Sequence, residues 1–265
     1  MEHSLNVEPI GYVRTGKVLK FQTPHQPDSQ AAEINQVILL SGKQFELAVE
    51  DLAGFERIWL IWWFHKNKTW RPRALPPRGP AKRRGLFATR SPHRPNPIGL
   101  TCVPLIFVEG LTLTVGPLDL VDGTPILDIK PYIPTVDAFP ESATGWLGEV
   151  EAELALAERF TITVSELALK QLKWLREQWQ IDFSERAFGL LEIDPSPHRT
   201  RRILKIDENL FRMACGPWRM YYRIDGFQVV IIEVMKGYSD ETLFAKGYEK
   251  IQDWEAQVEF SKTKF

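Results

Sequence analysis

Ile58-Trp59-Leu60-Ile61-Trp62-Trp63-Phe64 is the longest apolar run in the chain, and it lies between Arg57 and His65. It is too short to cross a bilayer, and a short apolar run between polar residues is typical of a buried β-strand. Similar runs at 10–13, 36–40, 100–108 and 111–115 are separated by turn residues. Strands and helices do not alternate, so the first half predicts a β-barrel or sandwich rather than a parallel α/β sheet.

The composition changes near residue 140, where an Ala/Glu-rich segment follows Asp137-Ala138-Phe139-Pro140. We expect a mainly β protein with a β-barrel domain at 1–140, a linker or surface helix at 141–160, and a small α+β domain at 161–265. The C-terminal domain is predicted to contain a hairpin with its turn at Asp225-Gly226 and a helical tail from residue 237.

An amphipathic helix is predicted to begin the C-terminal domain. Thr163 and Glu166 have the spacing of a capping box. The apolar residues that follow at helical spacing are Val164, Ala168, Leu172, Leu175 and Trp179.

The composition is that of a globular protein, with 44% hydrophobic and 25% charged residues and a net charge of -1. The two cysteines, Cys102 and Cys215, suit a reducing cytoplasm better than a disulfide scaffold or a zinc site. The N-terminus shows no signal-peptide pattern, so a cytoplasmic location is expected.

The positive charge is concentrated between Lys66 and Arg94, where ten Lys or Arg residues occur without an Asp or Glu. That leaves 23 of the 33 basic residues for the remaining chain, against 34 acidic ones. A charge run is often only a solvated loop. Here it includes Trp70 and leads into a rigid segment, so it also fits a surface that binds RNA phosphates and stacks on bases.

That rigid segment is Ser91-Pro92-His93-Arg94-Pro95-Asn96-Pro97-Ile98-Gly99. Three prolines make it stiff and mostly extended, so it can present polar side chains at fixed positions. A second polar stretch, 119–132, places Asp119, Asp122 and Asp128 around an Asp-Gly turn. Alone it would be a solvent-facing hairpin, but it can also accept protons or hydrogen bonds from a ligand. No phosphate-binding, dinucleotide, serine-hydrolase or metal motif is present, and we expect no metal.

Taken together, these blocks strongly resemble the TrmO (YaeB/TsaA-like) family over roughly residues 6–135. The resemblance includes the rigid segment with the preceding Gly85–Arg90, the stretches 119–125 and 128–132, Ile10-Gly11, Pro24–Pro27, Trp59, His65, Trp70–Pro72 and Pro76–Arg78.

The resemblance implies an S-adenosylmethionine-dependent tRNA methyltransferase built on a β-barrel. It also implies methylation of N6 of N6-threonylcarbamoyladenosine beside the anticodon, mainly in threonine tRNA, by a homodimer with the cofactor near its interface. The positions that match the family's cofactor site are Pro27, Asp28, Ser29, His65, Lys66, Arg90, Leu100, Leu118, Asp119 and Asp122. The positions that match its RNA-facing surface are Arg71, Arg78, Lys82, Arg83 and Arg84. Arg199, a basic residue of the C-terminal part, is also expected to bind RNA.

The chemistry of such a transfer indicates which residues catalyse it. The attacking N6 must lose a proton, so a general base is useful. The expected bases are Asp122, which is preferred because it lies in the turn, and Asp128. Arg94 or Arg90 is expected to stabilise negative charge or hold the threonyl carboxylate.

The C-terminal part departs from the family pattern. Where members often carry Asp-Pro-Arg-x-x-Tyr, this chain has Asp194-Pro195-Ser196-Pro197-His198-Arg199, and nearby Arg201 and Arg202 are candidates to supply the charge. The helix and hairpin here are also similar in topology to small RNA-directed toxins. Three alternatives stay open: a non-catalytic RNA-binding β-barrel, a methyltransferase acting on another substrate, and a structural dimer without a ligand.

Overall fold

The computed structural model describes residues 5–16, 34–77, 79–244 and 251–265. The chain divides into two compact units. The barrel unit consists of Met1–Ala74 and Arg84–Ser142, and the C-terminal unit consists of Leu75–Arg83 and Ala143–Phe265.

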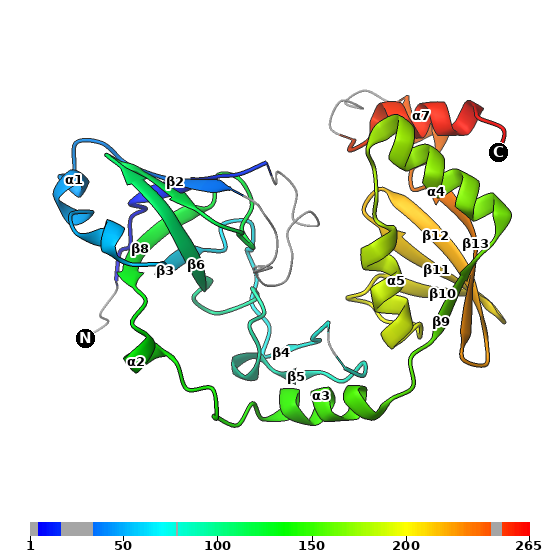
Figure 1. Cartoon of the computed structure of the whole chain (residues 1–265), viewed down its shortest axis with the longest axis horizontal. Coiled ribbons are helices and arrows are strands. Elements are labelled where there is room, and N and C mark those ends of the chain that lie inside the picture. The colour runs from blue at the N-terminus through cyan, green and yellow to red at the C-terminus, as the bar shows by residue number, and fades with distance from the viewer. Residues whose placement is uncertain (1–4, 17–33, 78, 245–250) are drawn as a thin grey trace. The chain divides into compact units, whose positions relative to one another are not determined.

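The barrel unit is a closed barrel with the strand order β1-β2-β7-β6-β3-β8 (Figure 1). Its strands are β1 Gly11–Arg14, β2 Asn35–Leu39, β3 Arg57–Trp63, β6 Ile98–Glu109, β7 Thr112–Val115 and β8 Pro125–Pro131. The strands predicted from the apolar runs are confirmed, and all neighbouring pairs are antiparallel. The short elements around them are α1 Phe45–Ala48, η2 Leu52–Gly54, β4 Arg73–Ala74, β5 Arg84–Gly85, η3 Leu86–Ala88 and α2 Pro134–Asp137.

Strand β3 alternates between the barrel core and the outside, as its sequence requires. Ile58 and Leu60 are fully buried and Trp62 is almost so, whereas Trp63 is exposed. The polar stretch 119–132, expected to be either a hairpin around the Asp-Gly turn or a ligand-binding loop, contains one strand, β8. It closes the barrel by pairing with both β1 and β3. Asp128 therefore lies on a strand rather than in a loop.

The C-terminal unit contains a five-stranded sheet in the order β10-β11-β12-β13-β9. Helices α4 and α5 lie against one face of this sheet, where Ala168, Ala187 and Leu191 meet Met220 and Tyr222 (Figure 1). The elements are α3 Trp146–Leu156, β9 Thr161–Val164, α4 Glu166–Trp179, α5 Ser184–Ile193, β10 Ile203–Asp207, β11 Leu210–Cys215, β12 Trp218–Asp225, β13 Gln228–Lys236, α6 Asp240–Leu243 and α7 Trp254–Lys262.

Two local predictions in this unit are wrong. The cap of α4 is Ser165, whose Oγ accepts from the Ala168 N–H at 3.0 Å, and Val164 belongs to strand β9. The predicted cap, Thr163, lies in β9, since pairing with β13 extends the strand up to Val164. The hairpin turn is Gly226-Phe227, because Asp225 pairs with Gln228. Gly226 has φ +55°, which glycine adopts without strain.

The side chain of Arg201 holds the C-terminal unit together. It is 5% exposed and donates from Nη1 to the Asp194 main-chain oxygen at 3.0 Å and to Oδ2 at 2.6 Å. Its Nε and Nη2 donate to the carbonyls of Pro77 and Gly79 at 3.1 and 2.8 Å. Burial opposes ionisation of Asp194, but hydrogen bonds from Ser196 and Arg201 outweigh it and lower its pKa. The Asp-Pro pair of the altered motif is thus a structural anchor here.

Replacing Arg201 with Gln should destabilise the C-terminal unit by about 3 kcal/mol, because the Asp194 carboxylate and two carbonyls lose their donor. Urea unfolding followed by hydrogen exchange in β10–β12 measures this change. Since the folded pKa of Asp194 is lowered, its contribution is present above its unfolded pKa of about 4 and is lost as the pH falls through the folded value. The variant should therefore lose less stability than the wild type on acidification.

The matched control is Arg199→Gln, an exposed arginine two residues away that should change stability by less than about 0.5 kcal/mol. Equal stabilities of the two variants would contradict the anchoring role of Arg201.

Candidate functional site

A cavity of about 790 Å³ lies on the barrel unit. It is lined by residues of β3 and β6, by the loops that follow β3 and precede β6, and by the loop between β7 and β8. A volume of this size accommodates a cofactor or a drug-sized ligand.

The pairing of β3 with β6 forms the floor of the cavity. Trp62 pairs with Gly99, the last residue of the rigid segment. The Trp62 ring lies so close to Gly99 that an added Cβ would be 2.3 Å from its Cε2 atom. Position 99 therefore requires glycine, because any side chain would prevent the Trp62 indole from packing over β6.

A chain of hydrogen bonds connects the barrel core to the cavity. Trp62 Nε1 donates to Thr101 Oγ1 at 3.0 Å, and that hydroxyl donates to Asp119 Oδ1 at 2.9 Å. Thr101 is only 4% exposed, and its single hydroxyl hydrogen is committed to Asp119. The carboxylate of Asp119 is consequently held in one position at the cavity wall.

The rigid segment is fastened to the barrel by its main chain. The Pro97 carbonyl accepts from the Phe64 N–H at 2.8 Å, and the His93 carbonyl accepts from the Arg71 N–H at 3.1 Å. Arg94 folds back on its own loop, since Nη1 donates to the Thr89 carbonyl at 2.9 Å and its guanidinium lies 5.7 Å from the Phe87 ring centroid. This loop therefore forms an ordered wall, although it is not a strand before Ile98.

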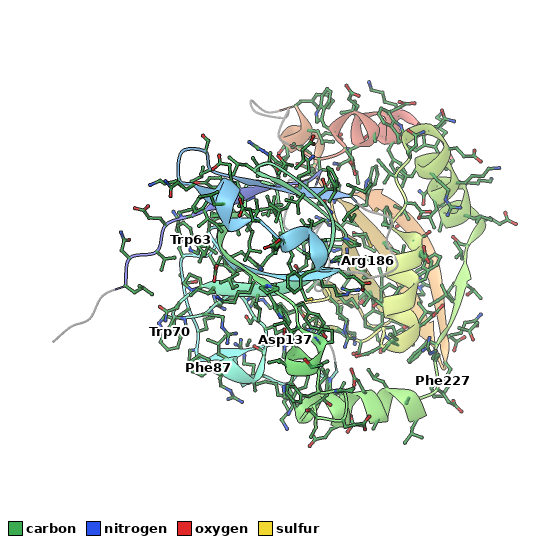
Figure 2. The ribbon with its side chains drawn as sticks, turned by 60° about the vertical axis from the view of Figure 1, so that its left-hand side comes forward. Trp63, Trp70, Phe87, Asp137, Arg186 and Phe227 are labelled. Carbon is green, nitrogen blue, oxygen red and sulfur yellow. The ribbon has the colours of Figure 1, made fainter. Side chains whose placement is uncertain are left out.

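The lining combines aromatic surface with positive charge. Trp59, Trp62, Trp63, Phe64 and Phe87 contribute rings, and Arg57, Lys66, Arg90 and Arg94 contribute cations. Phe87 is 78% exposed and Trp63 is 42% exposed, so both rings are accessible (Figure 2). Among the lining residues Asp119 carries the single carboxylate. Such a site suits a planar base together with an anionic group.

Cys102 also lines the cavity but does not supply a nucleophile. Burial raises the pKa of its thiol, although Arg57 acts in the opposite direction. The thiol therefore stays protonated at neutral pH, whereas thiol nucleophiles react as thiolates.

The structure brings some of the predicted site residues together and separates others. His65, Lys66, Arg90, Arg94, Leu100 and Asp119 all line the cavity. Leu118 is fully buried in the barrel core. Asp122 accepts from the Thr15 N–H at 3.1 Å and pairs with Arg14 at 3.6 Å, whereas Asp128 pairs with Lys130 at 2.8 Å. Neither carboxylate lines the cavity. Pro27, Asp28 and Ser29 lie outside the described residues.

The predicted RNA-facing residues divide between the two units. Arg71 and the half-buried Arg84 belong to the barrel unit, whereas the exposed Lys82, Arg83 and Arg199 belong to the C-terminal unit. Arg78 lies outside the described residues.

Sequence reasoning did not identify Thr101, Trp62 or Phe87 as site residues. Thr101 lies in an otherwise apolar strand, and a polar residue there is a weak signal without knowledge of its partner. The pairing of Gly99 with Trp62 could not be read from the sequence, because the two residues are far apart along the chain.

Gly99→Ala should destabilise the barrel unit by about 1–3 kcal/mol, because the new methyl group overlaps the Trp62 ring. The near-ultraviolet circular dichroism of the tryptophans should change as well. Gly85→Ala is the matched control, since open space surrounds Gly85. The packing argument fails if both variants unfold at the same urea concentration as the wild type.

Two family models match the chain. The model described as the tRNA-methyltransferase O N-terminal domain matches residues 12–138. The model described as the ParE toxin of the type II toxin–antitoxin system, parDE, matches residues 162–240. The first contains the barrel and its cavity, and the second contains most of the C-terminal sheet.

Two curated relatives extend this comparison. A tRNA (adenine(37)-N6)-methyltransferase from Escherichia coli (strain K12) is 36% identical over 183 residues, which are 66% of this chain and 76% of that protein. A putative S-adenosylmethionine-dependent methyltransferase, RcsF, from Pseudomonas aeruginosa is 41% identical over 145 residues, 54% of this chain and 60% of that protein.

A solved structure covers more of the chain. The crystal structure of TrmO from Pseudomonas aeruginosa is 28% identical and has a TM-score of 0.51. The match covers 88% of this chain and 98% of that one. The cavity lies in the domain that the family model matches, and the match to the E. coli relative covers three quarters of that protein. The chain therefore belongs to the tRNA-methyltransferase O (TrmO) family.

Proposed function

We propose that the protein is an S-adenosylmethionine-dependent tRNA methyltransferase that methylates N6 of an adenosine beside the anticodon. The observation that carries this proposal is the cavity, which joins exposed aromatic rings, four cations and one fixed carboxylate on a barrel of this family. The names of the relatives from E. coli and P. aeruginosa support both the reaction and the cofactor.

The cofactor supplies an electrophilic methyl group on its sulfonium sulfur. His65, Lys66, Arg90, Leu100 and Asp119 line the cavity and are the residues proposed to hold it. The exposed Leu100 offers apolar surface, and the cations attract the carboxylate of its methionine part. The aromatic rings are suited to stack on adenine. Among the described residues no group of three side chains suitable for a metal is found, and the proposed transfer uses none.

Asp119 replaces Asp122 and Asp128 as the proposed proton acceptor. The N6 nitrogen must lose a proton at or near methyl transfer, and Asp119 is the single carboxylate among the described residues that line the cavity. Asp122 and Asp128 are engaged by Arg14 and Lys130 away from the cavity. The hydrogen bond from Thr101 to Oδ1 orients the Asp119 carboxylate at the cavity wall.

We further propose N6-threonylcarbamoyladenosine, mainly in threonine tRNA, as the substrate. A substrate carboxylate suits a guanidinium, and exposed Arg90 is better placed to bind it than Arg94, which is bonded to its own loop. A cytoplasmic homodimer, with the cofactor near the subunit interface, belongs to the same proposal. Within the described ranges no helix has the length and hydrophobicity needed to span a bilayer.

The direct test is methyl transfer to threonine tRNA with and without the threonylcarbamoyl group, followed by mass spectrometry of the nucleosides. The proposal expects one additional methyl group on the modified adenosine and at least a hundredfold slower reaction with unmodified tRNA. Binding of tRNA without any cofactor binding would instead identify a non-catalytic RNA-binding barrel. Methylation of a different nucleoside would contradict the proposed substrate.

Asp119→Asn should reduce kcat by about 100-fold or more, because general-base catalysis typically contributes that much. The affinity for S-adenosylmethionine, measured by calorimetric titration, should fall much less. Asp128→Asn is the matched control, and its kcat should stay within twofold of the wild type. A similar loss of kcat in both variants, or an unchanged kcat in Asp119→Asn, would exclude Asp119 as the base.

A further inference from the structure

The C-terminal sheet carries an arginine cluster on the face opposite the helices. The cluster consists of Arg202, just before β10, Arg212 on β11 and Arg219 on β12. Phe211, Met213 and Met220 point to the helix-covered core. Because side chains alternate along a strand, Arg212 and Arg219 lie on the other face.

Strand register places these arginines next to one another. Ala214 pairs with Arg219, and Arg212 lies two residues before Ala214 on the same face. The two guanidinium-bearing residues are therefore diagonal neighbours, separated by roughly 7–8 Å at the backbone. The Ala214 N–H donates to the Arg202 carbonyl at 3.1 Å, which brings the third arginine to the same end of the sheet. The small side chain of Ala214 leaves space between them.

One carboxylate, that of Glu233 on β13, lies on the same face in register with Tyr221, but within the described part of the chain it forms no ion pair with the cluster. Among the described residues none of the three arginines forms an ion pair, and Arg219 donates to the carbonyls of Gly216, Trp218 and Gly237. Burial lowers the pKa of Arg219, and the positive charges of Arg212 and Arg202 lower it further. Three like charges held together without a counter-ion are unfavourable unless an anion binds them.

Arg212 supplies a second observation that points to a ligand. Its Nε atom is buried and has no hydrogen-bond partner among the residues described. A buried donor without an acceptor destabilises the folded protein, and a bound anionic oxygen that accepts the hydrogen bond would remove this penalty. Arg202 also has φ +58°, in the left-handed region that non-glycine residues rarely adopt and that often occurs at binding sites.

Cys215 shows that the site is not a thiolate site. Arg219, Arg186 and Arg202 all act to lower the pKa of this thiol, but burial raises it to about 12. Cys215 therefore remains neutral on the core face and does not cancel the positive charge. Arg186, labelled in Figure 2, acts on the same thiol from α5, on the helix-covered side of the sheet, and is not part of the cluster.

We propose that the arginine cluster binds backbone phosphates of the tRNA substrate, as a contact site separate from the cavity of the barrel unit. Guanidinium groups bind phosphate oxygens through two parallel hydrogen bonds. Exposed apolar side chains accompany the cluster on this face: Leu204, Ile206 and Met235 are 49%, 46% and 43% exposed. With half-buried Tyr221 in register with Arg212, they offer surface for ribose and bases.

The substrate assignment rests on the proposed function, since tRNA is chosen over an acidic protein segment because the family acts on tRNA. The test therefore measures tRNA binding alone, without cofactor. It uses the full chain, a fluorescently labelled transcript of threonine tRNA without modifications, and salt concentrations from about 50 to 200 mM.

The informative variants are Arg212→Gln and the double variant Arg202→Gln/Arg212→Gln. Arg212 has no partner at Nε, so its loss should leave the thermal stability unchanged. Each substitution should weaken tRNA binding about tenfold, the effect of losing one charge-assisted hydrogen bond. The plot of log affinity against log salt should become less steep by about 0.9 per lost phosphate contact.

Lys170→Gln is the matched control, because it removes one exposed positive charge from α4 on the helix-covered side of the sheet. Its affinity for tRNA should stay within twofold of the wild type. Equal weakening by Lys170→Gln, or wild-type affinity and salt slope in the double variant, would overturn the proposal. The proposal would also be overturned if the Arg212→Gln variant bound a labelled polyglutamate peptide more weakly than the wild type but bound tRNA equally well.

The test of the phosphate site can be distinguished from the test of the proposed methyltransferase function. If methyl transfer is absent but Arg212→Gln weakens tRNA binding, the proposed function fails and the phosphate site stands. If methyl transfer occurs with an unchanged KM for tRNA in the double variant, the phosphate site fails and the function stands.

Discussion

The packing of the Trp62 indole against Gly99 is the constraint on which the barrel and its cavity both depend. It joins β3 to β6, buries the indole in the barrel core, and leaves its Nε1 directed at Thr101. Thr101 in turn fixes Asp119. One aromatic contact therefore determines where the Asp119 carboxylate lies on the cavity wall. The prolines before Gly99 keep the adjoining loop ordered at little entropic cost, which preorganises the wall for a ligand.

A different principle organises the C-terminal unit. There a buried guanidinium, Arg201, satisfies four acceptors that the chain would otherwise leave unpaired. The Tyr222 hydroxyl adds a bond to the Pro195 carbonyl at 2.5 Å. Arginine thus has two distinct uses in this unit. Arg201 is bonded to carbonyls and a carboxylate and stabilises the fold, whereas Arg202, Arg212 and Arg219 form no ion pair with any residue that the structure describes.

Sequence patterns predicted the barrel strands well, since short apolar runs between turns leave few alternatives to strands. They did not decide between a hairpin and a loop at 119–132, where β8 forms because it pairs with β1 and β3. The resemblance to the family identified His65, Lys66, Arg90 and Asp119, which the structure brings to one cavity. It did not separate Asp122 from Asp119, because only the tertiary position of Arg14 shows that Asp122 is engaged elsewhere. The sequence indicated Arg202 as a basic candidate but could not group it with Arg212 and Arg219, because strand register rather than spacing brings these residues together.

Amide hydrogen exchange with and without S-adenosylmethionine tests the central claim, that the cavity built on β3 and β6 holds the cofactor. The account predicts slower exchange at residues 63–67, 86–94, 98–101 and 118–121, which contribute to the lining. Exchange in β10–β13 should remain unchanged. Protection confined to the C-terminal unit, or none at saturating cofactor, would contradict the account.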